Sequence, residues 1–202
     1  RDAVIELTKS GIEGLVIDVR GNSGGLLNNA ISMLDILTDR GLLLLETKGR
    51  MKRANKTIYS RRKPLVGNNI PIVVLINKST ASASEILAGV LQDLDRAVIL
   101  GKKSFGKGLV QSMFNLNDTT TLKITTAKYY TPSGRLIQKQ DYLDNGFLTD
   151  GLDKKDSIFT TISGRIVKGG GGITPDIESE NNKMREITTF NITQTLPANC
   201  GI

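Results

Sequence analysis

The sequence of 202 residues contains no histidine, and this absence limits the hydrolytic sites that the chain can build. A serine nucleophile on this chain cannot use an imidazole as its base, so a Ser-His-Asp arrangement is excluded. The practical alternative is a lysine whose amine is neutral when it takes the serine proton. Any serine hydrolase built on this chain is therefore expected to pair serine with lysine.

Cysteine and aromatic residues are also scarce. Cys200 is the single cysteine, so no disulfide forms within the chain and a zinc site of the Cys/His type is excluded. Tryptophan is absent and aromatic residues make up 4% of the chain, so aliphatic side chains must fill the core. No apolar run approaches the length of a membrane span.

Acidic residues are outnumbered by basic ones, 20 against 27, which gives a formal net charge of +7. The basic runs 52–53 and 61–63 lack interleaved aromatic residues and match no nucleic-acid motif. These runs favour a solvated surface, and a nucleic-acid partner is not expected.

Apolar segments of two kinds alternate along most of the chain. The β-branched runs 14–20 and 71–77 are typical of buried strands, and residues 26–38 and 84–94 repeat apolar side chains at helical spacing. This alternation predicts an α/β or mixed α+β fold. Further strands are expected at 42–47, 97–100, 109–116, 120–130 and 164–167, a helix at 2–9, and a hairpin with an exposed loop at 48–69, while 139–163 and 179–202 show no clear pattern.

The first apolar strand ends in a glycine-rich turn over residues 18–25, and a helix follows at once. Consecutive glycines such as Gly24 and Gly25 let the backbone approach a ligand and point amide N–H groups at it. The helix N-terminus adds positive potential, so this turn can stabilise an oxyanion. A plain strand-to-helix connection would use glycine in the same way.

A serine-rich turn, residues 79–85, follows the strand at 71–77. Ser82 and Glu85 match the Ser-x-x-Glu capping box, so helix capping alone accounts for Ser82. The functional interpretation places the Ser82 hydroxyl and the Ala83 amide at the mouth of one pocket. Both turns are expected at the carboxyl ends of strands, where open α/β sheets usually carry their sites.

Lys107 is the best-placed candidate for the base. It lies between Gly106 and Gly108 and leads into an apolar strand, although most lysines are solvated surface charges. Gln111 lies four residues further on, and alternate residues of a strand share a face, so Gln111 can orient the amine. Asp93, in the helix after Ser82, helps position the site or caps a helix end.

Six ordered segments together resemble the carboxy-terminal processing peptidases, also called tail-specific proteases, of serine peptidase family S41. The resemblance covers most of residues 13–178. Any one segment is a weak signal, and the specificity comes from all six in order. The segments are residues 18–25, 79–85, 92–93, 106–108 with Gln111, 130–135 and 172–176.

The resemblance implies a role for each matching residue. Ser82 matches the nucleophile, Lys107 the general base and Gln111 the partner that orients it. Asp93 matches an acidic residue of the same helix. Ala83 and one of the glycines at 24 and 25 match the oxyanion-hole positions.

The family likeness also implies an architecture and an activity. The fold would be a crotonase-like core, of the ClpP/crotonase type, with helices packed on twisted sheets over residues 1–178, and residues 179–202 have no assigned role. A PDZ domain that docks substrate C-termini is expected upstream of residue 1. The implied activity is ATP-independent cleavage of proteins at or near their C-termini through an acyl-enzyme. Neither a metal nor an organic cofactor is needed, the oligomeric state is open, and the implied location is extracytoplasmic, in the periplasm, cell envelope or thylakoid lumen.

Two other function classes remain open from the sequence. A non-catalytic ligand-binding module on the same fold would not need a base, so the set of Ser82, Lys107 and Gln111 argues against it. A crotonase-like acyl-CoA enzyme would also use paired amides for an oxyanion. Such an enzyme needs a site for the adenine and phosphate groups, which would show as a coenzyme A-dependent shift in melting temperature.

Overall fold

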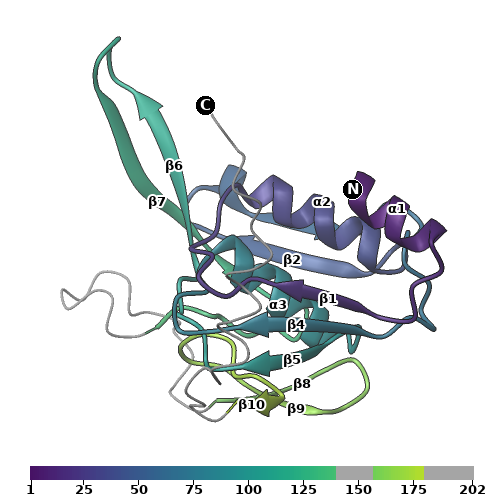
Figure 1. The fold of residues 1–202 in the computed structure, drawn as a ribbon. Coiled ribbons are helices and arrows are strands. Elements are labelled where there is room, and N and C mark those ends of the chain that lie inside the picture. The colour runs from purple at the N-terminus through teal and green to yellow at the C-terminus, as the bar shows by residue number, and fades with distance from the viewer. Residues whose placement is uncertain (140–156, 180–202) are drawn as a thin grey trace, which may run out of the picture.

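The computed structural model of the protein describes residues 1–139 and 157–179 (Figure 1). It confirms the mixed α/β architecture, with two four-stranded sheets, a separate two-stranded pair and helices packed on the sheets. The segments 140–156 and 180–202, including Cys200, lie outside the described residues. Within the part of the chain that is described, no helix has both the length and the apolarity to cross a membrane.

The first sheet is parallel and has the strand order β1-β4-β5-β10. Its strands are β1 (Leu15–Asp18), β4 (Ile72–Ile76), β5 (Val98–Gly101) and β10 (Ile177–Glu178). The first three are apolar runs that the sequence predicts as strands. The expectation of a buried strand is wrong for β1, because β1 lies at the sheet edge and leaves Val16 64% exposed. The short β10 adds to the edge of β5, a pairing that the sequence pattern does not reveal.

The second sheet is antiparallel and has the order β3-β2-β7-β6. Its strands are β2 (Leu43–Lys48), β3 (Lys56–Tyr59), β6 (Leu109–Asn115) and β7 (Thr121–Tyr130), with a 3-10 turn η1 (Lys52–Ala54) between β2 and β3. The expected antiparallel strands β6 and β7 are confirmed. The hairpin expected within residues 48–69 is formed instead by β2 and β3, so it begins before residue 48. The β6–β7 hairpin extends well beyond the rest of the molecule (Figure 1). The third, two-stranded sheet pairs β8 (Ile158–Thr160) with β9 (Ile166–Lys168).

The helices match the expected positions closely. They are α1 (Asp2–Lys9), α2 (Leu27–Leu37) and α3 (Ala83–Asp93), and α2 packs against α3. All residues of α3 are buried. One apolar core joins α2, α3 and both sheets through fully buried aliphatic side chains, which include Leu34, Leu44, Leu45, Val74, Leu91 and Ile99.

Candidate active site

Three loops meet at the carboxyl ends of β1, β4 and β5. Thr80 Oγ1 donates to the Val19 carbonyl at 2.8 Å, and the Ala81 amide donates to the Asn22 carbonyl at 3.0 Å. The Gly21 amide donates to Asn77 Oδ1 at 3.0 Å. These bonds join the glycine-rich turn to the serine-rich turn, as expected for neighbouring parallel strands.

Ser82 stands at the N-cap of α3 with φ 54° and ψ −118°. Apart from glycines, only Ser82 and Asp95 have a positive φ within the described residues. A non-glycine residue persists in such a conformation only when its surroundings hold it there, and such residues cluster at functional sites. The sharp turn leaves Ser82 half-buried on the wall of a cleft of about 420 Å³.

The carboxylate of Glu85 holds this turn by hydrogen bonds, and its side chain is fully buried. Its Oε2 accepts hydrogen bonds from the amides of Ser82 and Lys107, both at 2.8 Å. Its Oε1 accepts from Ser104 Oγ at 2.5 Å and from the Gly106 amide at 2.7 Å. Burial raises the pKa of the Glu85 carboxyl, and the four hydrogen bonds offset only part of that rise.

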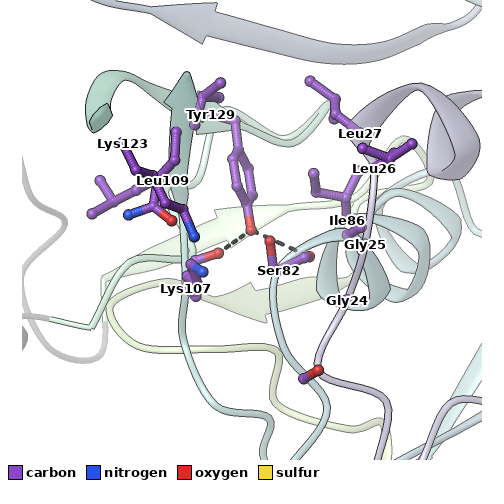
Figure 2. A pocket seen from close by; sticks show the side chains of 14 residues that line it. Gly24, Gly25, Leu26, Leu27, Ser82, Ile86, Lys107, Leu109, Lys123 and Tyr129 are labelled. Carbon is purple, nitrogen blue, oxygen red and sulfur yellow. Dashed lines mark hydrogen bonds between the residues drawn. The ribbon is translucent and has the colours of Figure 1, made fainter. Parts of the chain in front are cut away.

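Tyr129 makes a second connection between Ser82 and Lys107. Its buried hydroxyl donates to the Lys107 carbonyl and lies 3.3 Å from the Ser82 carbonyl (Figure 2). Burial, together with the nearby Glu85, raises its pKa. Glu85 thus holds the amides of Ser82 and Lys107, and Tyr129 faces their carbonyls. We call this pair the Glu85–Tyr129 clamp.

Sequence reasoning recognised only the capping role of Glu85 and did not single out Tyr129. One signal was available for Glu85, because an acidic residue lies beside Ile86 and Leu87 in a helix of mostly apolar residues. Burial of a carboxyl group in such a helix requires hydrogen-bond donors from elsewhere. The sequence gives no comparable signal for Tyr129.

Lys107 and Gln111 reach the same cleft as Ser82. The glycines beside Lys107 are sterically required, since Gly106 has φ +95° and a Cβ at Gly108 would lie 2.6 Å from the Gln138 amide nitrogen. Within residues 1–139 and 157–179, no hydrogen bond joins the Ser82 hydroxyl to the Lys107 amine. Catalytic hydrogen bonds are often long without substrate and tighten in the complex.

The glycine turn lies directly over the start of α3. Gly24 has φ +101°, and a Cβ there would lie 2.8 Å from Ser82 Cβ and 2.9 Å from the Ala83 nitrogen. Only a glycine keeps the space in front of the Ala83 N–H open. The Gly24 amide itself donates to Asn22 Oδ1 at 2.9 Å. In the described part of the chain, the N–H groups of Gly25 and Ala83 have no hydrogen-bond acceptor.

Asp93 is not brought to this cleft. It lies at the C-terminal end of α3 and forms an ion pair with Arg135 at 2.7 Å, with both side chains buried. It also accepts a hydrogen bond from the Ser133 amide at 3.0 Å. Nearby, Gln92 donates to Asp176 Oδ1 at 2.9 Å. The segments 92–93, 130–135 and 172–176 therefore meet in a partly buried polar network that joins α3 to the chain after β7 and before β10.

The remaining site residues predicted from the sequence share one cleft. The lining includes Ser82, Ala83, Lys107, Gln111, Gly24 and Gly25. Within the described ranges, no group of three or more His, Cys, Asp and Glu side chains is arranged to hold a metal ion.

The sequence matches the model of a known family, described as peptidase family S41, over residues 1–147. It is 44% identical over 138 residues to a carboxy-terminal-processing protease of Bartonella bacilliformis, covering 68% of this chain and 31% of that protein. It is 42% identical over 139 residues to a chloroplastic C-terminal processing peptidase of Tetradesmus obliquus, covering 69% of this chain and 29% of that one. The chain thus spans about a third of the length of these relatives.

Two solved structures superpose on most of this chain. A photosystem II D1 C-terminal processing protease superposes with a TM-score of 0.64 at 31% identity, covering 89% of this chain and 38% of that one. A putative S41 protease from Bacteroides fragilis superposes with a TM-score of 0.62 at 20% identity, covering 89% and 41%. The second comparison supports the fold alone.

Proposed function

Because this chain belongs to peptidase family S41, we propose that the cleft is the active site of a serine endopeptidase with a catalytic dyad of Ser82 and Lys107. One observation carries the proposal. Ser82 and Lys107 line one cleft, and the clamp ties their backbones together on both the amide and the carbonyl side. The absence of histidine leaves lysine as the base for this serine.

The reaction begins when the neutral Lys107 amine takes the Ser82 hydroxyl proton as Oγ attacks the scissile carbonyl carbon. The resulting oxyanion accepts hydrogen bonds from the N–H groups of Ala83 and Gly25. We favour Gly25 as the second donor because the Gly24 amide is already bonded to Asn22. Gln111 orients the Lys107 amine.

Collapse of the tetrahedral intermediate breaks the C–N bond. The Lys107 ammonium returns its proton to the leaving amine, and the acyl group stays on Ser82 as an ester. A water molecule then gives a proton to Lys107 and attacks the ester carbonyl. The carboxylic acid product departs when Ser82 Oγ recovers its proton, which restores the starting state.

Protein C-termini are the proposed substrates, since the relatives of this chain are named C-terminal processing proteases. The proposal extends to a location outside the cytoplasm. The family likeness and the chloroplastic relative support that location, and cell fractionation with an antibody to this chain tests it.

Casein hydrolysis by the protein in its natural full length tests the function. Wild type is expected to cleave casein, and Ser82→Ala is expected to be inactive with an unchanged melting temperature. Lys63→Ala, which removes an exposed lysine outside the cleft, is the matched control and is expected to retain full activity. Cleavage by Ser82→Ala at the wild-type rate would rule out Ser82 as the nucleophile.

A further inference from the structure

The cleft that holds Ser82 contains a second lysine, which the proposed reaction does not use. Lys123 lies on β7 and lines the cleft together with Lys107. Figure 2 shows Lys123 beside Leu109, on the side of the cleft that faces the glycine turn. Most lysines are solvated surface charges that line no cleft. The position of Lys123 therefore suggests a role toward the substrate.

The backbone of β7 directs Lys123 into the cleft. Lys123 and Tyr129 are six residues apart on this strand, and both line the cleft. Ile124 and Thr126 line a separate hollow on the other face of the β6–β7 hairpin. Side chains alternate between the two faces of a strand. Lys123 thus faces the cleft because of its place in a paired strand, opposite Met113 of β6.

Lys123 has no acidic partner in the described part of the chain. No ion pair joins it to a carboxylate there. Its neighbours on the facing strand are Gln111, Met113 and Asn115, all of them uncharged. None of the described side chains that line the cleft is acidic, and the buried Glu85 carboxylate already accepts four hydrogen bonds. A negative charge that enters the cleft therefore meets an unpaired ammonium.

Strand geometry sets how far Lys123 lies from the reacting bond. It pairs with Met113, two residues beyond Gln111 along β6, and the proposed mechanism places Gln111 beside the Lys107 amine. Two residues of a strand span about 7 Å, and neighbouring strands lie about 5 Å apart. An extended substrate advances about 3.3 Å per residue, so its side chains about two to three residues from the scissile bond lie within reach of Lys123.

We propose that Lys123 selects substrates that carry an aspartate or glutamate side chain about two to three residues from the scissile bond. The ammonium donates hydrogen bonds to that carboxylate while the substrate backbone lies across Ser82. The same charge repels a basic side chain at that position, which adds to the specificity. The charge recognised belongs to an internal side chain and not to the end of the polypeptide. This inference rests on the proposed function, because it names the substrate class that the same cleft receives.

Peptide binding without hydrolysis tests the inference separately from catalysis. Fluorescent peptides of one apolar sequence carry either Glu or Gln at a single position that is moved along the peptide. Both ends are blocked, so neither end is charged. The peptides are titrated into Ser82→Ala, in the natural full-length protein, and anisotropy is followed. The best Glu peptide is expected to bind about threefold to tenfold more tightly than its Gln counterpart. Equal affinity for Glu and Gln at every position would overturn the proposal.

Charge reversal locates the selection. Lys123→Glu, in the Ser82→Ala background, is expected to reverse the preference, so that a peptide with Lys at that position binds more tightly than the Glu peptide. Lys52→Glu makes the same change in charge at an exposed residue outside the cleft and is expected to keep the preference for Glu. Sodium chloride at about 0.5 M is expected to narrow the preference by screening. A preference for Glu that survives in Lys123→Glu, or equal losses in the two variants, would overturn the proposal.

Hydrolysis separates selection from a catalytic or structural role. Active wild type is expected to show a lower KM for the Glu peptide than for the Gln peptide, and mass spectrometry is expected to place the cut two or three residues from the Glu. In Lys123→Met the ratio of the two kcat/KM values is expected to fall to about one. Equal loss of turnover on both peptides would overturn the proposal, because Lys123 would then serve the reaction itself. If the binding preference is present and hydrolysis is absent, the proposed peptidase function fails and the selective site stands.

Discussion

Replacement of Glu85 by glutamine tests the clamp at the side chain that accepts four hydrogen bonds. Each carboxylate oxygen of Glu85 accepts two hydrogen bonds, one pair from Ser82 and Lys107 and the other from Ser104 and Gly106. Glutamine keeps the size of the side chain and turns one of these acceptors into an NH2 donor. The substitution therefore changes hydrogen bonding without opening a cavity.

The best orientation of the new glutamine side chain leaves one amide without a partner. Its carbonyl oxygen faces the amides of Ser82 and Lys107, and its NH2 faces Ser104 Oγ, which is able to accept. The Gly106 N–H then points at a donor. A buried N–H without an acceptor costs about 1–3 kcal/mol, and relief of the burial cost of a charge offsets part of this. We expect the free energy of unfolding to fall by about 2 kcal/mol.

The effect on catalysis is expected to exceed the effect on binding. Gly106 precedes Lys107, so a displaced Gly106 amide moves the base relative to Ser82. Misplacement by about 1 Å can cost about a hundredfold in rate, so kcat is expected to fall about tenfold to a hundredfold, with KM little changed. Urea unfolding and peptide hydrolysis measure the two effects, with Glu6→Gln on the exposed face of α1 as control.

The raised pKa of Glu85 decides how its contribution to stability changes with pH. Because burial raises the pKa of Glu85 in the folded protein, ionisation costs more in the folded state than in the unfolded chain. The contribution of this group to stability is complete at acid pH and is lost as pH rises through the raised pKa. The stability difference between wild type and Glu85→Gln therefore narrows with rising pH.

An unchanged unfolding free energy together with unchanged kcat in Glu85→Gln would refute the clamp.

Three further substitutions test separate parts of the site and fold. Tyr129→Phe removes the hydroxyl that bonds to the Lys107 carbonyl, and is expected to lower kcat with KM unchanged and to cost about 1 kcal/mol in urea unfolding. Gly24→Ala places a methyl group in front of the Ala83 N–H and is expected to lower kcat about a hundredfold or more in peptide hydrolysis. Burial alone would raise the pKa of Asp95, but hydrogen bonds from Ser163 and Arg165 outweigh it and lower the pKa to about 2. Arg165→Gln is therefore expected to cost about 1 kcal/mol in urea unfolding at pH 7, and this difference is lost as pH falls through the lowered pKa.

The sequence predicted the parts of the site that depend on local pattern. The apolar runs that became β1, β4 and β5 carry their turns at the carboxyl ends, and this geometry brings Ser82 and the two glycines together. The absence of histidine pointed from Ser82 to lysine, and the flanking glycines pointed to Lys107. Each of these inferences uses residues close together in the chain.

The clamp was not predictable in the same way. Its contacts join Glu85 to residues near 105 and Tyr129 to Ser82, and no periodicity specifies such long-range hydrogen bonds.

Asp93 was predicted from the sequence as a candidate site residue, and the structure places it away from the cleft. Its place in a family-like segment suggested the site, and the fold uses it in a buried ion pair with Arg135 at the far end of the same helix. A motif shows that residues belong together without saying whether they serve the fold or the chemistry.

The most direct test of the dyad is covalent labelling of Ser82 by a fluorophosphonate, followed by intact mass and peptide mapping. Wild type is expected to gain a single adduct, located on Ser82. Lys107→Met, which removes the amine and keeps most of the unbranched side chain, is expected to react at least a hundredfold more slowly with its fold intact by circular dichroism. Labelling of Lys107→Met at the wild-type rate, or an adduct on another serine, would contradict the account.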